Sequence, residues 1–204
     1  MQVEGVNFWA TYAPVISWQT ICLTLILSLL SGLTSHQVDY VSAYTQAPLD
    51  CDLYMNIPVG FIMQYDQLIL MRSSTKGYSS DFVLCIKKNM YGLCQAGNNW
   101  FDTLKQSLIK RGFIQSTLDL CFCLFIRANC LIVFYIDDCL LFTKSDAVLD
   151  SVISSLQSEF NLTSEGDVGA FLGVDSSSLN LASSPKLSPF AIGVTTVYRH
   201  ADLP

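Results

Sequence analysis

The stretch LIVFYIDDCLLF (131–142) places two adjacent acids, Asp137 and Asp138, in the middle of an otherwise apolar run. The apolar residues on each side, 130–135 and 139–143, are each long enough for one buried strand. Runs this short with so tight a joint predict an antiparallel β-hairpin whose tip carries the acids. An ionised carboxylate that is buried without a partner is strongly unfavourable, so these acids must face solvent, a cation or a metal.

The segments around this hairpin alternate between strand and helix patterns. Residues 121–126 form a third apolar run, which extends the hairpin to an antiparallel meander. The spacing of apolar residues predicts helices over 98–112, with Asn98 as N-cap and Gly112 at its end, and over 146–160. Further short strands are expected at 37–40, 53–57 and 82–87, and a loop at 64–80. Strands paired in an antiparallel sheet, with helices on one face, make an α+β fold.

One long apolar segment allows two interpretations. No Asp, Glu, Lys or Arg occurs between Gly5 and Val38, and ISWQTICLTLILSLLSGL (16–33) is close to the ~20 residues of a membrane span. Ser, Thr and Gln residues interrupt it, however, and no Lys or Arg cluster flanks it. A core helix explains the segment as well, with an inward face of Ile21, Leu25, Leu29 and Leu33. The hydroxyl residues of another face are then Ser17, Thr24, Ser28 and Ser31.

The composition excludes several classes of protein. Of the 204 residues, 51% are apolar and only 14% are charged, which is too apolar for a disordered chain. The formal net charge of -6 does not fit a strongly basic protein that coats nucleic acid. The cysteines include no CxxC pair, so the short paired spacings of a zinc site are missing. We expect reduced core cysteines, and the N-terminus lacks the pattern of a signal peptide.

A third acid has the same relation to a strand. Asp39 follows an apolar strand residue in HQVDYVSAY (36–44), as Asp137 follows the apolar run of the hairpin. Three carboxylates at the ends of short strands can converge on hard cations such as Mg²⁺. A carboxylate cluster with two such ions is typical of phosphoryl transfer. The alternative is that Asp137 and Asp138 simply form a good turn.

Five blocks of the sequence resemble the reverse transcriptases of copia-type LTR retrotransposons, in that family's order. The box YIDD (135–138) is similar to the family's Tyr-x-Asp-Asp box, and 86–104 to its Tyr-Gly-Leu-Lys-Gln block. The segments that resemble its Thr-Phe-Ala-Pro-Val block, its first catalytic Asp and its Phe-Leu-Gly block are 8–27, 36–61 and 164–174. Each block is weak alone, but their order makes the resemblance specific. It implies an α+β right-hand polymerase palm, an antiparallel sheet backed by helices, with partial fingers.

The resemblance implies roles for five residues. Asp39 and Asp137 match metal-binding carboxylates and Asp138 the less direct ligand, which implies catalysis with two Mg²⁺ or Mn²⁺ ions. Tyr44 matches the aromatic residue beneath the nucleotide sugar, where its ring would exclude a 2′-hydroxyl. Gln95 matches the glutamine that contacts the incoming nucleotide. From residue type alone, Tyr44 can also be a core aromatic and Gln95 an ordinary exposed glutamine.

The resemblance covers residues 1–175, and we expect 176–204 to be a divergent, disordered tail. It implies an RNA or DNA template–primer duplex and deoxynucleoside triphosphates as partners, with the thumb, RNase H and integrase domains of a polyprotein missing. It also implies no membrane and an intracellular location, in a cytoplasmic particle or the nucleus. Cys22 and Cys94 stand where the family usually has cations, so we expect a truncated, weak or inactive RNA-directed DNA polymerase. The alternatives are a non-catalytic remnant with the same fold and a small membrane-anchored protein that uses 16–33.

Overall fold

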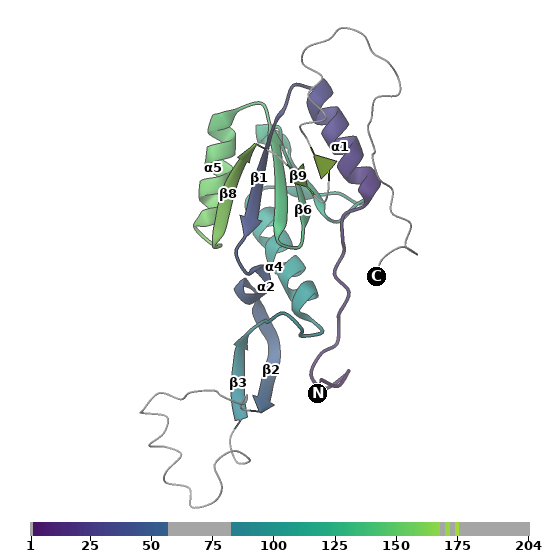
Figure 1. Cartoon of the computed structure of the whole chain (residues 1–204), viewed down its shortest axis with the longest axis vertical. Coiled ribbons are helices and arrows are strands. Elements are labelled where there is room, and N and C mark those ends of the chain that lie inside the picture. The colour runs from purple at the N-terminus through teal and green to yellow at the C-terminus, as the bar shows by residue number, and fades with distance from the viewer. Residues whose placement is uncertain (1, 57–82, 168–169, 172–173, 176–204) are drawn as a thin grey trace, which may run out of the picture.

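The computed structural model describes residues 2–56, 83–167, 170–171 and 174–175, and its centre is a six-stranded antiparallel sheet (Figure 1). The strand order is β4-β5-β6-β7-β1-β8. The bounds of these strands are Thr34–Tyr40 for β1, Ile114–Gln115 for β4, Phe122–Phe125 for β5, Cys130–Tyr135 for β6, Asp138–Thr143 for β7 and Leu162–Asp167 for β8. The predicted combination of an antiparallel sheet with helices is confirmed, and the predicted hairpin is the β6–β7 pair.

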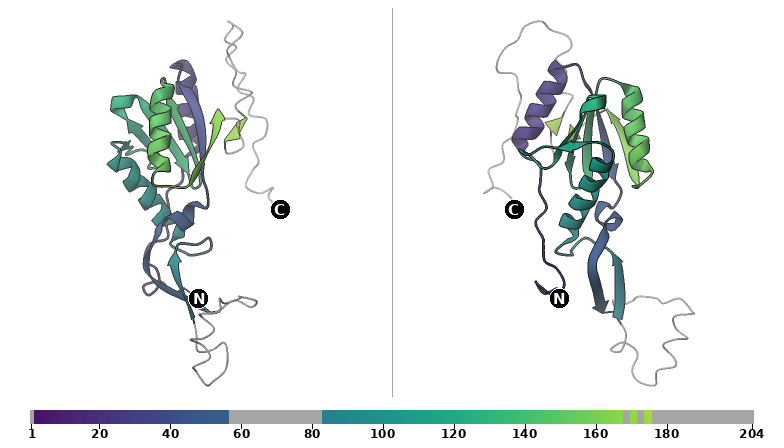
Figure 2. Two further views of the ribbon diagram at one scale, coloured as in Figure 1. Left: turned by 90° about the vertical axis from the view of Figure 1, so that its left-hand side faces the viewer. Right: turned by 180° about the vertical axis from the view of Figure 1, so that it is seen from behind.

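Two smaller sheets lie outside this centre. β2 (Pro48–Asn56) pairs with β3 (Val83–Lys88) in an antiparallel ribbon that extends away from the six-stranded sheet (Figures 1 and 2). The short strands β9 (Ala170–Phe171) and β10 (Val174–Asp175) pair with each other. Two predicted segments lie outside the described residues, namely the loop at 64–80 and the disordered tail at 176–204.

Helices cover both faces of the central sheet. α4 (Ala96–Lys110) and α5 (Asp146–Gln157) lie on one face, and α1 (Trp18–Leu30) lies across the sheet from α5 (Figures 1 and 2). α2 (Ala43–Gln46) is a short turn of helix between β1 and β2. Residues 139–143 of β7 are consequently all buried, as in a strand that is covered on both faces. The expectation of helices on one face only is therefore wrong.

The start of α4 differs from the prediction, whereas its end agrees with it. The helix begins at Ala96, before the predicted N-cap Asn98, and Gln95 occupies the N-cap position without a capping side-chain bond. Its C-terminal end is predicted correctly. Gly112 adopts the left-handed backbone conformation, with φ of +91°, that commonly follows a helix C-terminus.

α1 packs with a face that differs from the predicted one. Ile21 and Leu25 are buried as expected, but Leu29 is 46% exposed, and Thr24 and Ser28 are buried in its place. Both hydroxyls donate to backbone carbonyls of the same helix, so their burial leaves no donor unpaired. Among the apolar residues that consequently face outward are Leu23, Leu27 and Leu30.

The length of α1 decides the question of a membrane span. The helix has 13 residues, whereas a bilayer requires about 20. In the described part of the chain, no helix is both long and apolar enough to cross a membrane. The rest of segment 16–33 forms the N-cap of α1 and the turn that leads into β1. The alternative of a span over 16–33 is therefore wrong.

The cysteines are free thiols, and half of them lie in the core. Burial raises the pKa of Cys121 and Cys123 to about 12, so both stay protonated and unreactive at neutral pH. The buried thiols are Cys121, Cys123, Cys130 and Cys139, and the others are exposed or partly exposed. The expectation of core cysteines therefore holds for these four.

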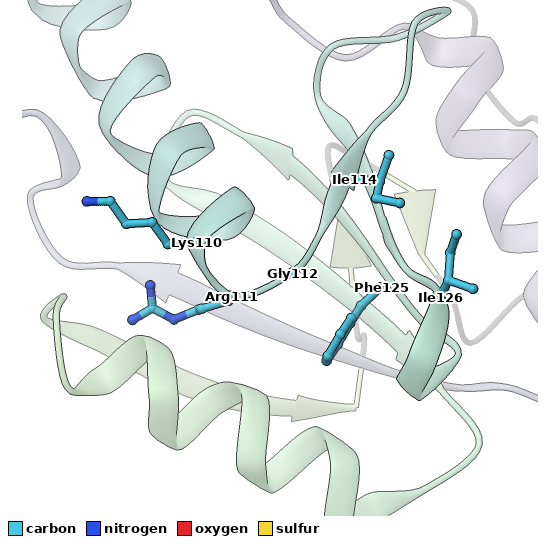
Figure 3. Close-up of a pocket in the computed structure, with 6 residues that line it drawn as sticks. All are labelled: Lys110, Arg111, Gly112, Ile114, Phe125 and Ile126. Atoms are coloured by element: carbon cyan, nitrogen blue, oxygen red, sulfur yellow. The ribbon is translucent and has the colours of Figure 1, made fainter.

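A cavity of about 620 Å³ opens beside the end of α4 (Figure 3). Its wall is close-packed where Gly112 meets Phe125, since a Cβ on Gly112 would lie 3.2 Å from the phenylalanine ring. The residues that line the cavity are Lys110, Arg111, Gly112, Ile114, Phe125 and Ile126. None of the predicted site residues is among them, so this cavity is not the predicted site.

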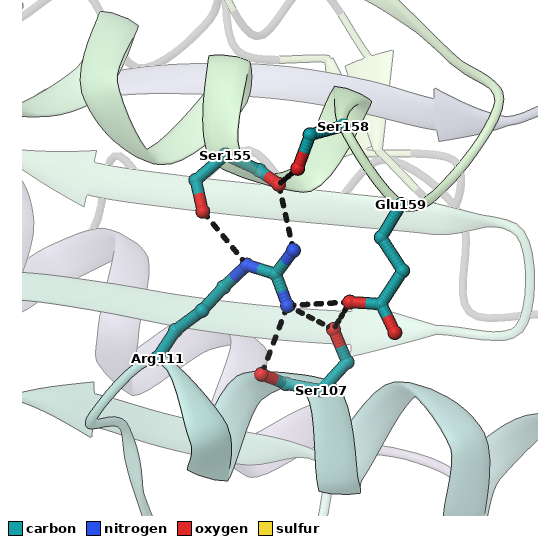
Figure 4. Close-up of polar contacts among 5 residues, drawn as sticks. All are labelled: Ser107, Arg111, Ser155, Ser158 and Glu159. Atoms are coloured by element: carbon teal, nitrogen blue, oxygen red, sulfur yellow. Dashed lines mark hydrogen bonds and ion pairs between the residues drawn. The ribbon is translucent and has the colours of Figure 1, made fainter.

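One arginine ties α4 to the end of α5 (Figure 4). Arg111 donates to the Ser155 hydroxyl at 2.9 Å and to the Ser155 carbonyl at 2.6 Å. It also forms an ion pair of 2.6 Å with Glu159 and bonds to Ser107 within its own helix. The Ser107 hydroxyl and then the Arg111 guanidinium lower the pKa of Glu159, although partial burial opposes them. The guanidinium suits this role because it presents five donors in a fixed planar geometry.

We expect Arg111→Gln to lower the free energy of unfolding by about 2 kcal/mol, because it removes the ion pair and the hydrogen bonds of a guanidinium side chain that is only 17% exposed. Because the folded state lowers the pKa of Glu159, the contribution of this ion pair is present above the unfolded pKa of Glu159. It is lost as the pH falls through the folded pKa. Urea titrations at pH 7 and pH 4 measure both effects.

The matched control is the same change at the neighbouring exposed cation. Lys110→Gln should cost less than about 0.5 kcal/mol, because Lys110 is exposed at the surface. Equal costs for the two variants at pH 7 would contradict the role given to Arg111.

Candidate active site

The tip of the β6–β7 hairpin has an unfavourable backbone conformation. Tyr135 pairs with Asp138, and between them Ile136 has a positive φ of +50°, which a β-branched residue rarely adopts. Such a conformation costs about 1–3 kcal/mol and persists only where the surrounding structure holds it. Here Trp100 of α4 donates from its indole nitrogen Nε1 to the Ile136 carbonyl at 2.7 Å. A buried side chain from another element therefore fixes the turn that carries the acids.

The three predicted acids meet at one end of two neighbouring strands. β1 runs antiparallel to β7, and Asp39 stands directly opposite Asp138. The next residue, Tyr40, donates its backbone N–H to the Asp137 carbonyl at 2.8 Å. Directly opposed residues of an antiparallel pair project from the same face, with Cβ atoms about 4.5–5.5 Å apart. The pairing of strands that are far apart in sequence therefore brings Asp39 beside the hairpin acids.

Burial and neighbouring carboxylates raise the pKa of both hairpin acids, Asp137 and Asp138. Burial raises the pKa of Asp137, and the charges of Asp39 and Asp138 raise it further, against a hydrogen bond from Tyr91. Burial and then Asp39 likewise raise the pKa of Asp138, against a hydrogen bond of 3.4 Å from Gln37. Neighbouring carboxylates repel each other, and this repulsion favours either the uptake of a proton or the binding of a cation.

The donor chemistry of the tip fits a hard divalent cation. Carboxylate oxygens are the ligands that Mg²⁺ prefers. Among the described residues, Oδ1 of Asp137 is one of two buried side-chain oxygen or nitrogen atoms that lack a hydrogen-bond partner. However, the described residues include no group of three or more His, Cys, Asp or Glu side chains gathered closely enough to hold a metal. The acids are neighbours, but their side chains do not converge on one point.

Two tyrosines lie beside Asp137. The Tyr91 hydroxyl donates to Oδ2 of Asp137 at 3.0 Å, and the Tyr91 ring lies 4.5 Å from the Tyr44 ring. Burial and the hydrogen bond to Asp137 raise the pKa of Tyr91 to about 12, so its hydroxyl remains a donor at neutral pH. Burial, and then the charge of Asp137, also raise the pKa of Tyr44. Tyr44 is thus at the edge of the core and next to the acids at the same time.

Sequence reasoning identified Tyr44 but missed Tyr91. Tyr91 lies in the block at 86–104 that resembles the family, so the signal was present. Nothing in the sequence shows that Tyr91 contacts Asp137, which lies 46 residues further along the chain.

Gln95 is fully buried, and its side chain bonds to none of the three predicted acids. Its amide oxygen accepts from Gln2 at 2.8 Å, and its amide nitrogen donates to the Asn7 carbonyl at 3.2 Å and to Asp50 at 3.4 Å. The alternative of an ordinary exposed glutamine is therefore wrong. Its contact with a nucleotide stays a prediction, since these partners belong to the N-terminal segment and to β2.

Residues 1–191 of the chain match a family model described as reverse transcriptase (RNA-dependent DNA polymerase). The chain belongs to this reverse transcriptase family. The match extends past residue 175, where we placed the end of the resembling segment. No solved structure significantly matches this reverse transcriptase chain.

Curated relatives support the same assignment. The chain is 27% identical to the "Retrovirus-related Pol polyprotein from transposon RE2" of Arabidopsis thaliana, over 85% of this chain and 11% of that protein. It is 27% identical to the "Transposon Ty1-ER2 Gag-Pol polyprotein" of Saccharomyces cerevisiae, over 74% of this chain and 8% of that protein. The reverse transcriptase chain thus spans about a tenth of the length of these relatives. The resemblance to copia-type retrotransposon reverse transcriptases is confirmed.

We expect Trp100→Phe to lower the free energy of unfolding by about 1–3 kcal/mol, because it removes the bond to Ile136 and part of a buried ring. The same change at Trp18, which is 49% exposed, is the matched control and should cost less than about 0.5 kcal/mol. Urea titration gives both values. A cost at Trp18 as large as that at Trp100 would argue against the special role of this bond.

Proposed function

We propose that this chain is the nucleotidyl-transfer part of an RNA-directed DNA polymerase from a retrotransposon polyprotein. The observation that carries the proposal is Asp39 opposite Asp138, beside Asp137, at the tip of a hairpin in a chain of the reverse transcriptase family. On this proposal the six-stranded sheet is the polymerase palm, and the β2–β3 ribbon belongs to partial fingers. Residues 1–175 form this unit and 176–204 are its tail, of which 176–191 still match the family model.

The acids would hold two divalent ions, Mg²⁺ or Mn²⁺. Asp39 and Asp137 would be the principal ligands, and Asp138 the less direct one. When bound, such ions activate the attacking primer 3′-hydroxyl and neutralise charge on the phosphates. Three contacts support this assignment: Trp100 bonds to the turn that carries Asp137, Tyr91 donates to Asp137, and the Tyr91 ring lies against the ring of Tyr44.

The substrates follow from this assignment. Tyr44 would lie beneath the sugar of the incoming deoxynucleoside triphosphate, and Gln95 would contact that nucleotide. An RNA or DNA template–primer duplex would lie along the acids, and the other polyprotein domains would complete its binding. An intracellular location, in a cytoplasmic particle or in the nucleus, stays a prediction.

Three observations favour the second candidate, a non-catalytic remnant of the same fold. The chain has 11 basic residues against 17 acidic ones, and Cys22 and Cys94 stand where the resemblance implies cations. Gln95 is also already paired with Gln2, Asn7 and Asp50. Each missing phosphate contact weakens duplex binding, because fewer counterions are released. The two candidates therefore differ in activity and agree in fold.

Primer extension on poly(rA) with an oligo(dT) primer and Mg²⁺ separates the two candidates. We expect weak extension that needs a high enzyme concentration, since a scarcity of cations places duplex binding in the range of about 10⁻⁴ to 10⁻⁶ M. Asp137→Asn should abolish extension, whereas Asp150→Asn, at an exposed acid of α5, should leave it unchanged. Equal extension by Asp137→Asn and the unaltered chain would refute the site. No extension from a folded, duplex-bound chain would establish the remnant.

A second experiment tests the position of the nucleotide sugar. Tyr44→Ala should admit ribonucleotides at least about tenfold more readily than the unaltered chain, because the ring that would meet the 2′-hydroxyl is gone. Tyr12→Ala, at a tyrosine that is 76% exposed, is the control. Competition between labelled deoxy- and ribonucleotides during extension measures the ratio. An unchanged ratio in Tyr44→Ala would remove Tyr44 from the nucleotide site.

A further inference from the structure

Tyr91 makes a contact that core packing does not require. Its side chain is 52% exposed, yet its hydroxyl donates to Oδ2 of Asp137 at 3.0 Å and its ring stacks against Tyr44 at 4.5 Å. A tyrosine placed only to fill the core would be buried and would lie away from the acids. The position of Tyr91 therefore needs another explanation.

The backbone that carries Tyr91 is held firmly. Asn89 is fully buried, and its amide donates to the carbonyls of Ala47 at 3.2 Å and Pro48 at 2.6 Å. The turn that follows contains Gly92 with φ of +98°. The Leu93 N–H then closes this turn onto the Met90 carbonyl at 3.2 Å. Tyr91 thus projects from a short turn that is anchored at its start and closed at its end.

The two oxygens of Asp137 have different surroundings. Oδ2 accepts from Tyr91, while Oδ1 is buried and has no hydrogen-bond partner among the described residues. A carboxylate that is free to rotate exchanges its two oxygens between positions. A donor fixed on one oxygen prevents this exchange and determines where the other oxygen points.

We infer that Tyr91 is a positioning residue that holds Oδ2 of Asp137, so that Oδ1 is directed at a divalent ion. This inference rests on the proposed function, since it requires Asp137 to be a ligand. Tyr91 touches neither substrate nor ion and acts only through Asp137. The stacked ring of Tyr44 keeps the Tyr91 side chain over the acid.

Removal of an outer partner of a metal ligand typically weakens metal binding by roughly 10–100-fold. Tyr91→Phe removes only the hydroxyl and keeps the ring that stacks on Tyr44. We therefore expect Tyr91→Phe to weaken Mn²⁺ binding by at least about tenfold and to leave the melting temperature nearly unchanged. A purely structural role would lower the melting temperature and leave the affinity for Mn²⁺ as it was.

The experiment is a titration of the full chain with Mn²⁺, without nucleic acid, in which free Mn²⁺ is followed by its electron paramagnetic resonance signal. The variants are Tyr91→Phe, Asp137→Asn and the control Tyr12→Phe, and thermal melting is recorded for each. Weakened binding in Tyr91→Phe and Asp137→Asn, but not in Tyr12→Phe, is the expected result.

The other outcomes identify which proposal fails. Unchanged Mn²⁺ binding in Tyr91→Phe, with binding lost in Asp137→Asn, overturns the role of Tyr91 and leaves the metal site intact. Unchanged binding in Asp137→Asn overturns the metal site of the proposed function, and the role of Tyr91 with it. The same holds if the unaltered chain binds no Mn²⁺.

Discussion

The register between β1 and β7 is the constraint on which the candidate site depends. It places Asp39 opposite Asp138, although the two residues are 99 positions apart in the sequence. A slip of one residue would turn Asp39 to the other face of the sheet. The core prevents such a slip, because Val38 of β1 and Cys139 of β7 are opposite each other and both are fully buried. The position of the acids is thus set by apolar packing one residue away.

α4 connects this register to the rest of the molecule. Its residue Trp100 packs edge-on against Tyr40 of β1 and against Phe160, and its indole nitrogen holds the strained turn at Ile136. The turn with Tyr91 lies just before the helix, and Arg111 at its other end fastens it to α5. A substitution that shifts α4 is therefore expected to displace both the hairpin tip and Tyr91, which donates to Asp137.

The sequence predicts those parts of the site in which acidic residues adjoin the apolar residues of a predicted strand. The hairpin is evident because two apolar runs flank adjacent acids, and Asp39 is evident because it follows an apolar residue of a predicted strand. The inward face of α1 is not, because Thr24 and Ser28 satisfy their hydroxyls within the helix and so can be buried. The contacts of Tyr91 and Gln95 are not evident either. Their partners lie 46 and 93 residues away in the chain, and the spacing of apolar residues along the sequence does not indicate such long-range contacts.

Several unfavourable features of the described residues gather at one place. The hairpin tip combines a β-branched residue in the left-handed region, two acids whose pKa is raised by burial and by neighbouring charge, and a buried carboxylate oxygen without a partner. The other buried unpaired atom among the described residues is the hydroxyl of Tyr40, which directly follows Asp39. Elsewhere in the described core, polar groups such as the hydroxyls of α1 and the amide of Asn89 are satisfied. Strain and unpaired polar atoms persist in a fold where the surrounding structure holds them and where a ligand can use them. That concentration, on a register fixed by apolar packing, is the physical argument for a site at the hairpin tip.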